Sequence, residues 1–255
     1  RSVIRSLLRE FRDPRGGFVS SVGLEDYDQS NLKATFDQHS WSEEEVRKIL
    51  EAEDAEWFIQ SFLAHDTQSR REAEHGGSKR TPRLMYSFEE DEADYWDLIR
   101  PRLEVARRQR YGGRPHRSSL RVCSHNALAA VALMRASVIL DEPKWFALAR
   151  STLSWISTKL WDGLRLSRAV RGEHRISVEA SLEDYMSTVW ALSELALYID
   201  DSHSAHLAEV IFDQGYEHFK DQDAGGFFHA SPTRRSLLPV HEKPILDTSD
   251  LSGNA

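Results

Sequence analysis

The stretch LEDYMSTVWALSELALYI, residues 182–199, is apolar on nearly every side of a helix, and LAEVIFDQGYEHF, residues 207–219, is apolar on one side only. The same order occurs earlier, where an almost wholly apolar run from Ala127 to Leu140 precedes a one-sided run from Trp145 to Leu160. A helix that is apolar all round is buried, whereas one with a single apolar stripe covers a surface. The repeat therefore predicts helical hairpins whose first helices form an inner layer and whose second helices form an outer layer.

A similar turn follows each one-sided helix. The turns read WDGL at residues 161–164 and DAGGF at residues 223–227, and DPRGGF at residues 13–18 follows a third one-sided helix, from Val3 to Phe11. Glycine adopts positive φ without strain and commonly ends a helix, so we expect each helix to stop there and a short extended segment to follow. Residues 251–255, LSGNA, read as the beginning of a further helix. We therefore interpret the chain as an all-α segment of a ring of hairpins, incomplete at both ends.

The composition is that of a globular protein. The chain has 255 residues, of which 40% are hydrophobic and 29% charged, and no apolar run approaches the ~18 residues that a membrane span needs. Acidic residues (41) outnumber basic ones (33), for a net charge of −8, and such a surface repels phosphate backbones and anionic lipids. The single cysteine, Cys123, excludes a disulfide within the chain. We therefore expect a cytoplasmic protein with no nucleic-acid or membrane partner.

The region between residues 19 and 120 has the weakest helical pattern. Ser42 followed by three glutamates predicts an N-cap and a helix that runs through Leu50, and a second helix is predicted from Glu53 to Ala64. Residues 65–81 are polar, contain glycine and lack periodicity, which predicts a flexible loop. We nevertheless expect residues 1–255 to form a single domain.

Two finer expectations concern helix interiors. A helical pattern from Glu89 to Arg110 contains Pro101, and because proline lacks an N–H and clashes with the preceding turn, we expect a break or kink near Arg100. In the later helix over 182–199, Leu195 and Ile199 fall on the predicted buried stripe.

Polar residues gather at the beginnings of three predicted inner helices, SHN at 124–126, SLEDY at 181–185 and DTSDLSGN at 247–254. A helix N-terminus carries unpaired N–H groups and the positive end of the helix dipole. If the inner helices all point the same way, these ends converge on one cavity, where acids, amides and an aromatic ring suit a polyol such as a sugar. Each cluster taken alone is also typical, and more commonly so, of helix capping. The expected substrate-binding residues are Asn126, Tyr185, Asp250 and Asn254.

Two reactions match such a cavity. Inverting glycoside hydrolysis needs an acid and a base roughly 6.5–9.5 Å apart, a pair that Glu183 or Asp184 could form with Asp247 or Asp250 from another helix. Epimerisation needs a base that removes a proton next to a carbonyl and an acid that returns it, and His125 stands at the predicted cavity mouth. The expected catalytic residues are Asp184, Glu183, Asp247 and His125. The alternative is that Asp184 caps a neighbouring helix and that His125 only fills space.

No metal or cofactor site is predicted. His203 and His206 stand one helical turn apart, but no third ligand accompanies them. We interpret them as a solvated pair at the beginning of an outer helix.

Residues 106–255 resemble the helical domain of the YyaL/spermatogenesis-associated protein 20 family, whose members join an N-terminal thioredoxin-like domain to an (α/α)6 toroid. That toroid is similar to those of N-acylglucosamine 2-epimerases and six-hairpin glycosidases. The resemblance implies a partial (α/α)6 toroid, a small carbohydrate ligand, and a thioredoxin-like domain ahead of this segment in the full-length protein. It rests on the following motifs in order: RPH at 114–116, Asn126, LEDY at 182–185, GGFF at 225–228, Asp247, and SGN at 252–254.

The chain departs from this family at several positions. SSL at 118–120 stands where the family has Asp-Asp-Lys, and His125 stands where it has Trp. Residues 23–25, GLE, replace an acidic stretch, and Leu251 stands where a proline is usual. Three acidic positions are thus neutral in this chain.

Two hypotheses for the function follow. In the first, the chain is a carbohydrate-active toroid with epimerase/isomerase-like or inverting-glycosidase-like chemistry. In the second, it is a non-catalytic scaffolding or partner-binding module that keeps the toroid's shape after its active site has decayed.

Overall fold

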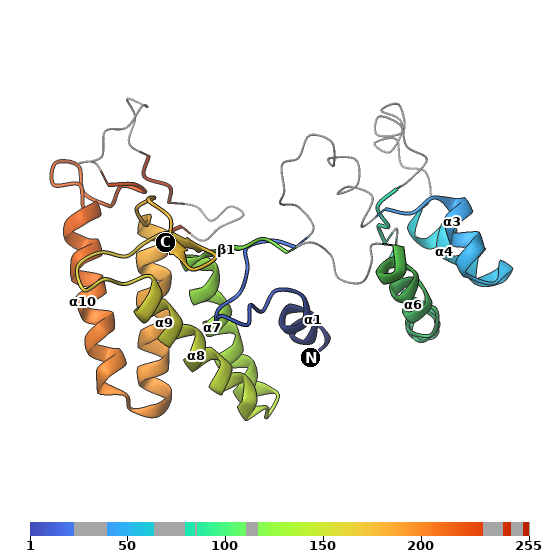
Figure 1. Cartoon of the computed structure of the whole chain (residues 1–255), viewed down its shortest axis with the longest axis horizontal. Coiled ribbons are helices and arrows are strands. Elements are labelled where there is room, and N and C mark those ends of the chain that lie inside the picture. The colour runs from blue at the N-terminus through green and yellow to red at the C-terminus, as the bar shows by residue number, and fades with distance from the viewer. Residues whose placement is uncertain are drawn as a thin grey trace. The chain divides into compact units, whose positions relative to one another are not determined.

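The computed structural model describes residues 1–22, 40–63, 80–84, 86–110, 117–231, 242–245 and 252–254 (Figure 1). The chain divides into two compact units, Arg1–Val22 with Arg117–Ala255, and Gly23–His116. We name them the hairpin unit and the aromatic unit. The single domain over residues 1–255 stays a prediction, and residues 65–79 of the predicted flexible loop lie outside the described residues.

Two helical hairpins form the body of the hairpin unit. The first consists of α7 (Cys123–Ile139) and α8 (Pro143–Lys159), and the second of α9 (Leu182–Ile199) and α10 (Ser202–Phe219). Within each hairpin the two helices pack together, and α7 also packs along α9, so that the four lie side by side (Figure 1). This arrangement confirms the predicted hairpins.

The two first helices run parallel. Near their beginnings the backbone N–H of Ser124 on α7 donates to Asp184 on α9 at 3.0 Å. Farther along, Arg135 on α7 bonds Glu194 on α9, with Nε 3.1 Å from Oε1. Both helices therefore begin at the same end of the unit, as the prediction of a common cavity requires.

A three-stranded antiparallel sheet lies at this end. It consists of β1 (Leu120–Val122), β2 (Ala169–Arg171) and β3 (His174–Arg175), in the order β1-β2-β3. In register, Val122 pairs with Ala169. The sheet adds to the predicted all-α architecture and joins the beginning of α7 to the segment between α8 and α9.

The helices α1 (Ser2–Glu10), α8 and α10 are each followed by a turn of the same kind. Each begins with an aspartate whose carboxylate accepts backbone N–H groups of the turn, and each ends where the chain pairs back across an isolated bridge, as the predicted extended segments require. We name them the aspartate turns. Their aspartates and bridges are Asp13 with Arg12↔Phe18, Asp162 with Trp161↔Leu166, and Asp221 with Lys220↔Phe227.

The core of the hairpin unit follows the predicted pattern except at the last turns of α7 and α9. Leu195 is buried, but Ile199, in the last turn of α9, is 42% exposed. The neighbouring Leu197 and the last residue of α7, Ile139, are exposed as well, because both helices extend beyond the packed core at that end. The prediction for Ile199 was therefore wrong.

Cys123, in contrast, is fully buried as a small packed side chain, and burial raises the pKa of its thiol well above the ordinary value.

The backbone segments on either side of residues 23–116 lie next to each other in the hairpin unit. Val22 forms an antiparallel bridge with Arg117. Beside it, the N–H of Ser20 donates to the carbonyl of Leu120 at 2.7 Å, and the N–H of Ser118 donates to the carbonyl of Ser21 at 3.1 Å. Residues 23–116 are therefore an insertion in the sequence between two residues, Val22 and Arg117, that pair with each other.

The aromatic unit contains α3 (Glu43–Ile49), α4 (Ala52–Phe62) and α6 (Glu90–Arg110). Ser42 and Glu45 form the predicted capping box of α3. Helix α6 continues through Pro101, contrary to the predicted break. The proline removes one backbone hydrogen bond, but Ile99 and Leu103 on either side are buried in the core of this unit and hold both halves of the helix.

Within the described part of the chain, no helix is long and apolar enough to cross a membrane.

Candidate functional site

Asp184 joins the beginnings of the two parallel helices. It is fully buried, in the first turn of α9. Its Oδ2 accepts from the backbone N–H and the hydroxyl of Ser181, at 2.9 and 3.0 Å, and from Nη1 of Arg168 at 3.1 Å. Its Oδ1 accepts the N–H of Ser124 at the beginning of α7. Four donors thus occupy the carboxylate, a placement that favours the capping interpretation over contact with a substrate.

Asn126 binds the first aspartate turn. Its side chain is fully buried in the first turn of α7. Oδ1 accepts the N–H of Phe18 at 2.6 Å, and Nδ2 donates to the carbonyls of Phe18 at 3.0 Å and Val122 at 2.7 Å. A Cβ at Gly17 would lie 2.7 Å from Oδ1 of Asn126, so this approach requires glycine there. The amide predicted to bind substrate is occupied by backbone groups.

Asn254 repeats this arrangement at the third aspartate turn. Its Oδ1 accepts the N–H of Phe227 at 3.0 Å, and its Nδ2 donates to the carbonyls of Phe227 at 2.9 Å and Pro244 at 3.1 Å. The residue before it, Gly253, lies against the first turn of α9, where an added Cβ would be 2.6 Å from Cγ of Leu182. Asn126 and Asn254 are therefore equivalent positions of the repeat.

Tyr185 forms a hydrogen bond with the second aspartate turn. Its hydroxyl accepts the N–H of Leu166 at 3.0 Å, and its ring meets Phe219 edge-on, with centroids 5.4 Å apart. Burial raises the pKa of the phenol, while the N–H of Leu166 lowers it by less. In all three turns, the N–H of the residue that closes the turn is thus held by a side chain from later in the chain, in the first turns of α7 and α9 for the first two turns and at Asn254 for the third. We name this contact the turn clamp.

The remaining predicted catalytic residues are placed less uniformly. Glu183 is buried beside Asp184, whereas His125 is exposed on the first turn of α7. Asp247 and Asp250 lie outside the described residues. The structure thus brings Asn126, Asp184, Tyr185 and Asn254 to one end of the hairpin unit, and the predicted acid–base pair across a cavity stays a prediction.

A small hollow opens at the beginning of α9. It has a volume of about 200 Å³, and we name it the α9 hollow. The backbone of His229 accepts the N–H of Leu182 at 3.0 Å and donates to the carbonyl of Glu242 at 2.8 Å, which fixes this residue beside the helix. The polar residues that line the hollow are Arg168, Glu179, Ser181, His229 and Ser231.

Arg168 connects the hollow to Asp184. Its Nη1 lies 3.0 Å from the Ser181 hydroxyl and 3.1 Å from Oδ2 of Asp184, and about a third of its side chain is exposed. The sequence patterns do not indicate Arg168 or Glu179 as site residues. They lie on either side of β2 and β3, between the second aspartate turn and α9, and the only signal for them in the sequence is the order of turns and helix beginnings.

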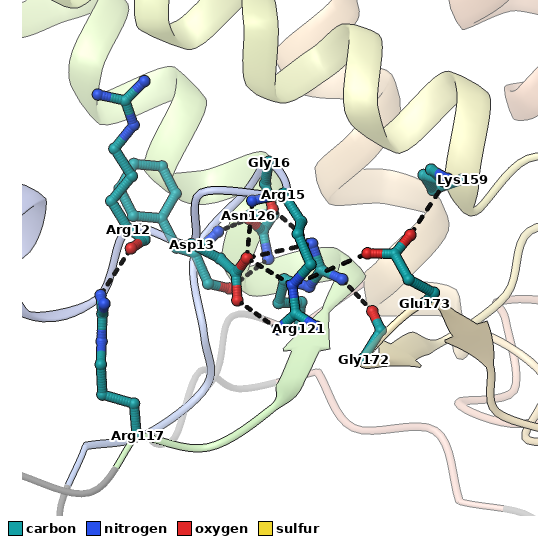
Figure 2. A network of polar contacts seen from close by, with 11 residues as sticks. Arg12, Asp13, Arg15, Gly16, Arg117, Arg121, Asn126, Lys159, Gly172 and Glu173 are labelled. Atoms are coloured by element: carbon teal, nitrogen blue, oxygen red, sulfur yellow. Dashed lines mark hydrogen bonds and ion pairs between the residues drawn. The ribbon is translucent and has the colours of Figure 1, made fainter.

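A second polar network surrounds the first aspartate turn (Figure 2). Arg121 is only 1% exposed, and its guanidinium donates to the carbonyls of Gly16, at 2.7 Å, and Gly172. It lies over the Trp155 ring at 5.0 Å, and its nearest carboxylate oxygen, on Asp13, is 4.0 Å away. Burial lowers the pKa of Arg121, although Asp13 opposes this shift. These contacts join the turn to the β2–β3 connection.

Asp13 itself is paired with Arg15 on the surface side of this network. Nε and Nη2 of Arg15 reach the two carboxylate oxygens at 3.0 and 2.9 Å. Burial, the largest single influence, raises the pKa of Asp13, but the hydrogen bonds from Arg15 and the charge of Arg121 outweigh it and leave the pKa lowered. Because the partners of Asp13 hold the turn in place, we conclude that this network stabilises the fold.

The comparisons with known proteins are sparse. No family model matches the chain, and no curated protein matches it. Solved structures that it is similar to include the cellobiose 2-epimerase from Spirochaeta thermophila DSM 6192, with 18% sequence identity and a TM-score of 0.41. The match covers 46% of this chain and 30% of the epimerase chain.

Proposed function

We propose that the hairpin unit is part of a sugar-enzyme-like (α/α)6 toroid and that it binds a small carbohydrate at the α9 hollow. The observation that carries this proposal is the position of the hollow, at the leading end of a first helix, beside the beginning of its parallel neighbour. Repeated hairpins with parallel first helices are the units from which such a toroid is built.

The groups around the hollow suit a hydroxyl-rich ligand. Arg168 supplies hydrogen-bond donors, Glu179 supplies acceptors, and the His229 imidazole supplies one of each when neutral. A sugar hydroxyl both donates and accepts, so a mixed set of this kind satisfies it. The volume, about 200 Å³, is below the roughly 300–1,000 Å³ of pockets for drug-sized ligands, which favours a single small molecule.

Asp184 acts in this proposal as a positioning residue. It would have to release one of its four donors to contact a ligand, whereas its bond to Nη1 of Arg168 already directs that guanidinium toward the hollow. We propose binding without assigning a catalytic step. The epimerase/isomerase-like and inverting-glycosidase-like reactions depend on Asp247 or His125 acting on a ligand held there.

The test is calorimetric titration of the whole chain with a panel of monosaccharides, accompanied by thermal unfolding. At least one sugar should bind and raise the melting temperature, and His229→Ala and Glu179→Gln should each weaken that binding. The matched control is His206→Ala, because His206 is exposed on α10, away from the hollow. Binding that is unchanged by His229→Ala would rule out the hollow as the site.

The second candidate function is a non-catalytic scaffolding module. The observation in its favour is that Asp184, Asn126, Tyr185 and Asn254 all direct their polar groups to the chain itself. In that case no sugar in the panel would bind the folded protein.

A further inference from the structure

The aromatic unit contains a pocket that the proposed function does not use. It has a volume of about 480 Å³, within the range of small-molecule sites. We propose that this pocket binds an organic carboxylate whose apolar body lies on its aromatic wall and whose charge meets Arg107. We name it the aromatic pocket.

The wall of the pocket is a set of packed rings. Phe58 stacks on Phe62, with centroids 4.9 Å apart, and Trp96 lies against Phe62 at 4.7 Å and against Phe58 at 6.0 Å. Phe58 and Trp41 are almost fully buried, so the wall is held in place by the core of the unit. A preformed apolar surface of this kind binds an apolar body at little ordering cost.

Another part of the pocket lining is also held in place. Residues 81–84 contribute Thr81, Pro82 and Leu84. The segment is tied down at Arg80, which exchanges two backbone hydrogen bonds with Trp41, each 2.8 Å long. Leu84 is 46% exposed at this rim. Segments far apart in the sequence thus enclose one space.

One face of α6 brings positive charge to the rim. Arg100, Glu104 and Arg107 all line the pocket, one turn apart. Arg100 is paired with Asp97 at 3.3 Å and with Glu104 at 3.7 Å, and Glu104 also pairs with Arg108 at 3.6 Å.

Arg107 differs from these neighbours. It is partly buried, and among the described residues no ion pair or hydrogen bond engages its side chain. A guanidinium beside an apolar wall recognises a carboxylate through paired, charge-assisted hydrogen bonds. Within the described part of the rim, Arg107 is therefore the one unmatched positive charge, and it sets the sign of the ligand.

The experiment uses 3-phenylpropanoate, its neutral amide 3-phenylpropanamide, and acetate as probes in calorimetric titrations of the whole chain. The acid should bind about tenfold or more tightly than the amide, because the amide lacks the charge. Acetate should bind weakly, because it lacks the ring. Equal binding of acid and amide, equal binding of acetate, or no binding of the acid would each overturn the proposal.

Variants locate the site. Arg107→Gln should weaken binding of the acid about tenfold and remove the preference for acid over amide. Arg102→Gln is the matched control, because Arg102 is exposed on the same helix, pairs with Asp54 and does not line the pocket. It removes the same charge from α6 and should leave both affinities unchanged.

Circular dichroism and thermal unfolding check that both variants fold. An unchanged preference in folded Arg107→Gln would contradict the proposal, and so would an equal loss of the preference in folded Arg102→Gln, because the charge of the whole helix would then account for it. Sugar binding at the α9 hollow is independent of either result.

Discussion

Helices α7 and α9 begin at the same end of the hairpin unit but are capped in different ways. The first turn of α9 is capped from within its own segment, because Ser181 donates its N–H and hydroxyl to Asp184, three residues later. Helix α7 follows Val122, which has no side-chain acceptor, and the N–H of Ser124 finds its acceptor on Asp184, 60 residues away. The beginning of α9 is thus complete in itself, whereas the beginning of α7 depends on α9.

Replacing Asp184 by Ala removes both caps at once and should have the largest effect. It leaves the buried N–H groups of Ser124 and Ser181 without acceptors, and each such group costs about 1–3 kcal/mol. With the lost bond to Arg168, we expect the free energy of unfolding to fall by about 3–5 kcal/mol. Urea denaturation measures this, and a loss below about 1 kcal/mol would mean that water or another side chain replaces the carboxylate.

The two equivalent asparagines allow the next comparison. Asn126→Ala should cost about 2–3 kcal/mol, because the backbone groups it leaves are buried. Asn254→Ala should cost only about 1 kcal/mol, because its site is partly exposed and water can replace the amide. Chemical denaturation of the two variants under the same conditions tests the order, and a larger loss at Asn254 would contradict it.

Ser181→Ala separates the two caps. It removes one hydroxyl from the cap of α9 and leaves the bond from Ser124 to Asp184 in place, so we expect a loss of about 1 kcal/mol. Amide hydrogen exchange should become faster in the first turn of α9 and stay unchanged in the first turn of α7. Equal acceleration in both helices would show that the two beginnings open together.

The smallest effect on stability is expected at the third aspartate turn, when the pH is lowered. The hydrogen bond from Lys243, with those from the N–H groups of Asp223 and Ala224, lowers the pKa of Asp221 to about 2. The pKa in the folded state is therefore below the ~3.9 of an unfolded chain. The carboxylate stabilises the fold fully above about pH 4, and this contribution is lost as the pH falls toward 2.

Lys243→Met tests this assignment. Without the ammonium group, the pKa of Asp221 should rise toward its ordinary value, and the stability of the variant should depend less on pH between about 4 and 2. Carbon-detected NMR titration of the Asp221 carboxyl measures the pKa directly. An unchanged pKa would show that the turn's own N–H groups account for the shift.

Features whose hydrogen-bond partners are close in the sequence are the ones that the sequence predicts. Features whose partners are distant in the sequence are not predicted. The bounds of α9 are those predicted, because its periodicity and its cap both lie within one segment. Helix α7 begins at Cys123, one residue before the polar beginning predicted at Ser124, but its cap comes from another hairpin and leaves no signal in the local sequence. The sequence does not predict the sheet for a related reason: its strands are only two or three residues long, and β1 pairs with β2 across a long stretch of chain.

For the candidate site, the sequence identified positions better than roles. Asn126, Asp184 and Tyr185 do lie at helix beginnings that share one end of the unit. A polar side chain that faces a cavity and one that bonds a turn or a helix beginning have the same sequence pattern, however, and the structure shows contacts of the second kind. Arg168 became a candidate only when the fold brought it to the beginning of α9.

The antiparallel bridge between Val22 and Arg117 has a consequence for how this chain can be cut and joined. The first turn clamp spans 108 residues, from Phe18 to Asn126, whereas the other two span 19 and 27. Closing the longer loop costs roughly 1–2 kcal/mol more in chain entropy. A direct connection from Val22 to Arg117 through a short linker would remove that cost. The hairpin repeat would then be an uninterrupted module. The 94-residue segment Gly23–His116 could be inserted again at that position, or another domain could be inserted in its place.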